Sequence, residues 1–200
     1  MPRYLPWGIF KEVEEQNPNP EQIDNTMRLR VLTSVRHRLP WLILGLLGGL
    51  LAAQIIGAFE NTLSKNILLA SFIPLVVYIS DAVGTQMEAF VIRDIAIHKG
   101  IHFVKYFIKQ FIIVTIMAVL LALGLYAVTL VMHQSANLSL AITLSMFFAI
   151  ESSIFTGIIL PVFFRRLRLD PANASGPIAT IIQDILSVTI YFAVASNLLG

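Results

Sequence analysis

Five long apolar stretches divide this chain, and each is long enough to cross a lipid bilayer as an α-helix. They lie at residues 40–59, 66–90, 108–132, 138–163 and 177–199. About 20 residues at 1.5 Å per residue cover the ~30 Å hydrocarbon core of a typical bilayer. The stretches are hydrophobic on every side and lack the alternation of membrane-spanning strands. The pattern predicts an all-α membrane protein with five transmembrane helices per subunit.

The composition supports lipid as the solvent around these stretches. Of the 200 residues, 56% are hydrophobic and 13% are charged, whereas soluble domains average about 45–50% and about 25%. The sequence contains no cysteine, which excludes disulfides and thiolate chemistry. The first apolar stretch begins near Pro40 and is too long and too deep in the chain for a secretory signal. We therefore interpret it as a true span.

The lysine and arginine residues fall on one side of a five-span alternation. Every one of them except Lys65 precedes the first span or belongs to the loops after the second and the fourth. Because basic loops remain in the cytoplasm, the pattern predicts a cytoplasmic N-terminus and an outside C-terminus in a multi-pass protein of the cytoplasmic membrane. Residues 1–38 are then a cytoplasmic segment with a membrane-connecting helix, and residues 39–200 are the five-helix domain.

The N-terminal segment has two parts of different character. Residues 12–25 are acidic and contain Pro18 and Pro20, as is typical of an exposed linker. Residues 26–41 are basic and partly apolar. This second part is either an amphipathic helix along the inner membrane surface or a basic flank that continues directly into the first span.

Four acidic residues interrupt the apolar stretches or lie at their edges: Asp81, Glu88, Glu151 and Asp184. A carboxylate near the bilayer centre costs on the order of 3 kcal/mol, so such residues usually face a partner or a watery cavity. Protonation or a bound cation would remove this cost. For Glu151 two interpretations stay open, a functional acid or a carboxylate bonded to Ser152 or another neighbour.

Two spans carry oxygen-bearing side chains along one face. Asp81, Thr85 and Glu88 are spaced by four and three residues in the second span, and Thr180 precedes Asp184 by four in the fifth. Mg²⁺ prefers oxygen ligands and binds proteins through one or two carboxylates and retained waters. The spans contain no histidine or cysteine, which softer transition metals recruit. The two faces therefore predict a site for a hard divalent cation.

Small residues recur every four positions in the first span, at Gly45, Gly49, Ala53 and Gly57. Such a stripe predicts close contact with a neighbouring helix of the same chain, and a dimer seam is the alternative. Pro74, Pro161 and Pro177 lie inside or at the start of later spans. Each predicts a kink or a helix start, and the alternative is a break that frees backbone carbonyls to bind an ion.

Other chemistries find little support in the sequence. There is no phosphate-binding or dinucleotide-binding glycine motif and no Gly-x-Ser-x-Gly elbow, so we do not expect an enzyme. His98 and His102 are spaced like metal ligands but lie in a basic loop, which indicates a solvated face. The basic clusters follow from membrane topology, so nucleic acid is not an expected partner.

Three stretches carry a family resemblance: HRLPWLILGLL, FIPLVVYISDAVGTQMEAFVIRDIA and RRLRLDPANASGPIATIIQDILSVTIYFAVASNLL. Together they resemble the transmembrane domain of the MgtE family of magnesium channels and transporters, over residues 26–200. The third is the most specific, with Asp-Pro-Ala, Ala-Ser-Gly-Pro and a later Thr and Asp in the family's order. The resemblance implies a ten-helix homodimer with a central cation pathway lined by the second and fifth spans.

The resemblance also implies roles for single residues. Asp184 matches the acid that holds hydrated Mg²⁺ beside its two-fold mate, and Thr180 matches a position that offers backbone oxygen near the ion. Asp81 falls where the family usually has Asn after two glycines, and this chain has Ile79 and Ser80 there instead. Glu88 is an additional acid. We therefore expect Asp184, Asp81, Thr180 and Glu88 to contact the metal.

The sequence thus predicts a homodimeric channel or transporter that moves hydrated divalent cations, with Mg²⁺ as the transported and pore-bound ion. The alternatives are a Na⁺- or H⁺-coupled exporter, with Glu88 or Glu151 as the coupling acid, and a membrane scaffold without transport. The resemblance does not include the cytoplasmic sensor domains typical of the bacterial family. Regulation by intracellular Mg²⁺ in that manner is therefore not expected from these 200 residues.

Overall fold

The computed structural model describes residues 31–97, 102–132, 135–166 and 171–199, and these residues are helical apart from short connections. The helices are α2 (Val31–Ala58), α3 (Glu60–Lys65), α4 (Leu68–Ile97), α5 (Phe103–Val131), α6 (Ala136–Ile154), η2 (Phe155–Ile159), α7 (Leu160–Arg166) and α8 (Pro171–Leu199). Residues 1–30, with the acidic linker, and His98 lie outside the described residues, whereas His102 is exposed just before α5.

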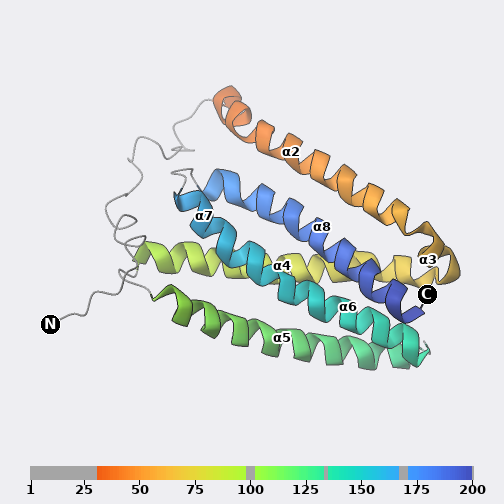
Figure 1. The fold of residues 1–200 in the computed structure, drawn as a ribbon. Helices are drawn as coiled ribbons and strands as arrows, with labels where there is room; N and C mark the ends of the chain where they lie inside the picture. The colour runs from red at the N-terminus through yellow and green to blue at the C-terminus, as the bar shows by residue number, and fades with distance from the viewer. Residues whose placement is uncertain (1–30, 98–101, 133–134, 167–170, 200) are drawn as a thin grey trace.

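The prediction of five membrane spans is confirmed. Five helical segments of 24 to 29 residues have mean hydropathies of 1.7 to 2.7 over their most apolar windows. In Figure 1, α2 lies at one edge of the bundle and α5 at the other, with α4, α6 and α8 between them. Helix α2 is continuous from Val31 through Pro40. The basic segment therefore continues directly into the first span from Val31 onward.

The core of the bundle surrounds α6 and α8. In the most apolar part of the fourth span 50% of the residues are buried, compared with 11% in that of α2. Tyr191 of α8 is fully buried, and its hydroxyl donates to the carbonyl of Leu69 at the start of α4, 2.7 Å away. The Phe192 ring stacks on Phe59 with 4.8 Å between centroids. These contacts hold the end of α8 against the α3 end of the bundle.

Helix α2 packs on α8 through a different stripe from the one expected. The expected within-chain contact is wrong for Gly45, Gly49 and Gly57, because no described atom would lie within 4 Å of a Cβ at these positions. Instead Gly48 is buried against Ile181 of α8. Successive residues on a helix point about 100° apart. Sequence spacing alone could not decide which of two adjacent stripes faces the partner.

Replacing Gly48 by alanine should lower the thermal stability of the protein, whereas the same change at Gly49 should not. A Cβ at position 48 would collide with the Ile181 side chain, and overpacking of this kind costs about 1–3 kcal/mol. Because both changes are Gly to Ala in one helix, the difference between their melting temperatures in detergent isolates the packing. Equal melting temperatures would contradict the observed rotation of α2.

The three prolines have different effects on their helices. Helix α4 continues through Pro74 and α8 through Pro177, so neither produces a break. The fifth helix begins at Pro171, six residues before the expected start at Pro177. Before Pro161, however, the turn Phe155–Ile159 is π-helical. Proline has no N–H for the carbonyl four residues earlier and crowds it, which disturbs the regular hydrogen-bond ladder at Gly157.

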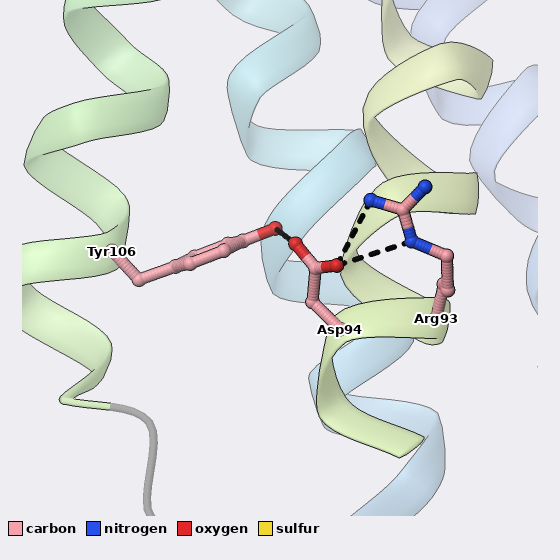
Figure 2. Close-up of polar contacts among 3 residues, drawn as sticks. All are labelled: Arg93, Asp94 and Tyr106. Carbon is pink, nitrogen blue, oxygen red and sulfur yellow. Dashed lines mark hydrogen bonds and ion pairs between the residues drawn. The ribbon is translucent and has the colours of Figure 1, made fainter. Parts of the chain in front are cut away.

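One end of the α4–α5 pair is fastened by a polar cluster. Asp94 of α4 accepts hydrogen bonds from Arg93 Nε and Nη2 at 3.2 and 3.0 Å and from the Tyr106 hydroxyl of α5 at 3.1 Å. Figure 2 shows Asp94 between the two partners. The cluster explains why α4 extends to Ile97, beyond the apolar stretch that ends at residue 90. In this last part of α4 the polar side chains form hydrogen bonds with one another and with α5.

Candidate cation site between α4 and α8

The structure brings together two of the acids and the threonine that the sequence singled out. Asp81 lies near the middle of α4 and Asp184 near the middle of α8, and their carboxyl groups are close enough to interact electrostatically. The Thr180 hydroxyl lies within hydrogen-bonding reach of the Asp81 carboxyl. Both acids are half-buried, whereas Thr180 is exposed. The cluster therefore lies at mid-span and opens onto one face of the bundle.

A buried polar network lies directly behind these acids. Ser80 and Ser187 share a hydrogen bond of 2.7 Å, and the Gln183 amide nitrogen donates to Ser187 Oγ at 3.1 Å. The Gln183 amide oxygen accepts from Thr156 Oγ1 at 2.8 Å. Ser80 adjoins Asp81 and Gln183 adjoins Asp184, so the buried residues fix the rotation of both helices. Satisfied networks of this kind specify one arrangement of a core.

Gln183 also joins α8 to α6. Its amide nitrogen lies 3.2 Å from the Ala149 carbonyl and 3.2 Å from Ser152 Oγ, and the residue is 1% exposed. Gln183 is not among the residues predicted from the sequence. The signal was present, because Gln183 and Ser187 are polar side chains one turn apart in an apolar span. A buried amide must find partners, so such a pair indicates a polar helix interface.

The backbones of α4 and η2 approach closely one turn from Asp81. A Cβ at Gly157 would lie 2.7 Å from the Gly84 carbonyl oxygen and 2.9 Å from Met87 Cβ. Only glycine permits this distance, because real Cβ atoms essentially never come within 3.0 Å of such atoms. The crossing therefore sets the position of α4 relative to the fourth span, and with it the position of Asp81.

Glu88 is not brought to the other two acids in this chain. It is 8% exposed, and its backbone nitrogen would be 3.5 Å from a Cβ at Gly157. Among the described residues, no three acids or histidines are grouped closely enough to hold a metal ion together. Glu88 lies on the same helical face of α4 as Asp81. Thr85, between them on that face, is exposed. Glu88 is buried instead, where η2 and α7 pack against α4.

Two carboxylates and a hydroxyl are too few ligands for a bare divalent ion. Mg²⁺ demands six oxygens in octahedral geometry and gives up water reluctantly, so it usually binds to one or two carboxylates through or beside retained waters. The cluster of Asp81, Asp184 and Thr180 matches that habit. Its open face leaves room for waters or for oxygen ligands from another chain.

Comparison with known proteins places the sequence of this chain in a family. Residues 73–194, which include Asp81, Glu88, Thr180 and Asp184, match the MgtE family, described as a divalent cation transporter. The chain is 34% identical over 179 residues to the magnesium transporter MgtE of Bacillus subtilis. It is 31% identical over 187 residues to that of Enterococcus faecalis and 27% identical over 171 residues to that of Thermus thermophilus.

These alignments cover 86%, 92% and 81% of the chain but only 39%, 39% and 36% of the three relatives. The chain thus spans about two fifths of the length of the relatives that it matches. The family match covers more than half of the chain and includes four of its five apolar helices wholly or in large part. The chain is therefore a multi-pass membrane protein that belongs to the MgtE family.

Proposed function

We propose that this chain forms a membrane pathway for divalent cations, that Mg²⁺ is the ion carried, and that the working unit is a homodimer. The observation that carries the proposal is the pair of half-buried acids, Asp81 and Asp184, which meet midway along two membrane spans. The MgtE relatives are named magnesium transporters, which supports Mg²⁺ as the ion. The membrane is the cytoplasmic membrane, with the N-terminus inside.

The open side of the site favours a second copy of the chain as its cover. Thr180 is exposed, Tyr78 on the preceding turn of α4 is 69% exposed, and both acids are only half-buried. A carboxylate that faced lipid at this depth would cost on the order of 3 kcal/mol. A two-fold axis beside α8 would bring two Asp184 side chains together and supply four carboxylates instead of two.

In the proposed mechanism, the two Asp184 side chains hold a largely hydrated Mg²⁺ ion between them. Asp81 and Thr180 shape the part of the pathway toward the cytoplasm. Glu88 lies two turns further along α4, roughly 10 Å away, and attracts the ion at the inner end. Paired carboxylates repel unless a cation lies between them, so ion binding should also stabilise the dimer.

Mg²⁺ uptake into proteoliposomes should rise with an inside-negative membrane potential. Each elementary charge gains about 2.3 kcal/mol per 100 mV, so a divalent ion gains roughly twice that. The measurement compares vesicles with an imposed potential, vesicles with none, and protein-free vesicles. Uptake that ignores the potential but needs a Na⁺ or pH gradient would instead indicate a coupled exporter, and no uptake would favour the scaffold.

A further inference from the structure

A fourth acid lies away from the cation site and has a different environment. Glu151 is near the midpoint of the span Ala136–Phe164. Both of its carboxyl oxygens are buried, and neither has a hydrogen-bond partner among the residues that the structure describes. Of the neighbours left open as partners, Ser152 is not one, because its hydroxyl donates to the Ala149 carbonyl at 2.7 Å. Glu151 is therefore a buried carboxyl that nothing in the bundle yet explains.

Thr115 of α5 lies beside the Glu151 carboxyl, and the hydrogen of its hydroxyl already has an acceptor within α5. A threonine hydroxyl has one hydrogen. In Thr115 that hydrogen is directed at the Phe111 carbonyl oxygen, 3.0 Å from Oγ1. An ionised carboxylate is also purely an acceptor, so an ionised Glu151 would place acceptor against acceptor. A protonated Glu151 would instead donate into a free lone pair of Thr115.

The ionisable groups on the helices around α6 do not offset a negative charge at Glu151. They are Tyr78, Asp81, Glu88, Arg93 and Asp94 on α4, Lys105, Tyr106, Lys109 and Tyr126 on α5, and Asp184 and Tyr191 on α8. Within the described part of the chain, none of them interacts with the Glu151 carboxyl. A lone carboxylate at mid-span would cost on the order of 3 kcal/mol or more.

The geometry points to Glu151 as a proton-binding site, with the proton held between its carboxyl group and Thr115 Oγ1. A metal ion does not fit the same place, because two carboxyl oxygens and one hydroxyl fall well short of the six or more oxygens that Mg²⁺ or Ca²⁺ takes. A proton needs only one donor oxygen and one acceptor. The site thus binds the smallest cation, separately from the divalent pathway between α4 and α8.

The proton would make the contact between α5 and α6 sensitive to pH. Release of the proton leaves a charge against the Thr115 lone pairs in a medium that solvates charge poorly. The Ala149 carbonyl of α6 also accepts a hydrogen bond from Gln183, which adjoins Asp184. Helix α6 therefore contacts both the proposed proton site and the network behind Asp81 and Asp184. This inference does not rest on transport of Mg²⁺, because it concerns only the charge state of Glu151.

Infrared spectroscopy of the protein in lipid at neutral pH tests the proposal directly. The wild type should show a carbonyl stretch of a protonated carboxylic acid that disappears in Glu151→Gln. The same band should shift in Thr115→Val, because the acceptor of its hydrogen bond is lost. Glu60→Gln is the matched control, because Glu60 is exposed in α3, and it should leave the band unchanged. A Glu151→Gln spectrum that loses only carboxylate absorption would overturn the proposal.

Thermal unfolding across pH gives a second readout that does not require an assigned band. A proton bound in the folded state and released on unfolding means that stability falls as the pH rises. Glutamine mimics the neutral acid. The melting temperature of Glu151→Gln, minus that of the wild type, should therefore increase as the pH rises. A difference that stays constant with pH would refute the proton site. If Glu151→Gln does not fold, the band shift in Thr115→Val alone decides the question.

Discussion

Replacing Asp184 by asparagine should lower Mg²⁺ uptake at least about tenfold and abolish the rise in melting temperature that Mg²⁺ produces. Asparagine keeps the shape of the side chain and removes its charge. A carboxylate about 5 Å from a divalent ion contributes several kcal/mol at an effective dielectric constant of ~20, and about 1.4 kcal/mol is already a factor of ten. In a homodimer the substitution removes two such charges from one ion. Proteoliposome uptake and thermal unfolding with and without Mg²⁺ measure both effects.

Two matched variants separate the pathway from charge in general. Glu60→Gln removes the same charge from α3, outside the apolar part of the spans, and should leave both readouts near wild type. Asp81→Asn should have a smaller effect than Asp184→Asn, because in the proposed mechanism Asp184 holds the ion and Asp81 shapes the pathway beside it. If Asp184→Asn kept wild-type uptake and Mg²⁺-dependent stabilisation, the proposed pore acid would be wrong.

Much of the fold could be predicted from hydrophobicity, because lipid forces each apolar stretch of sufficient length into a helix. The ends of the helices could not, since hydrogen bonding continues past the apolar residues. Helix α4 extends to Ile97, with Asp94 bonded to Arg93 and Tyr106 in its last turns, and α8 begins at Pro171, in keeping with the preference of proline for the first turn of a helix. Neither cause leaves a hydrophobic signal.

For the predicted cation-binding residues, too, part of the arrangement could be predicted from the sequence and part depends on packing. Helical spacing predicted that Asp81 and Glu88 lie on one face of α4, and they do. Spacing does not predict which neighbouring helix packs against each turn of that face. Helices η2 and α7 pack beside the Glu88 end of α4, whereas the Asp184 helix lies beside Asp81. The sequence also left Glu151 undecided, because the packing of α5 on α6 decides which side chain lies beside its carboxyl group.

Replacing Gly157 by alanine should destabilise the folded bundle by about 1–3 kcal/mol or more and strongly reduce Mg²⁺ uptake. The new Cβ would meet the Gly84 carbonyl oxygen at 2.7 Å, and a backbone atom in the middle of a helix cannot move aside alone. Helix α4 must therefore shift away from η2, which carries Asp81 away from its position beside Asp184. Thermal unfolding and proteoliposome uptake, each normalised to the amount of folded protein, measure the two consequences.

Alanine substitutions at two other glycines serve as controls for Gly157→Ala. A Cβ at Gly84 would lie 3.3 Å from Thr156 Oγ1, a contact that a shift of a few tenths of an ångström relieves, so Gly84→Ala should be milder. A Cβ at Gly124 would meet no described atom within 4 Å, and Gly124→Ala should leave stability unchanged or raise it slightly. The three variants share the same chemical change, so their order reports how closely the backbones approach. If Gly157→Ala were as stable and as active as Gly124→Ala, the contact between α4 and η2 could not be what positions Asp81.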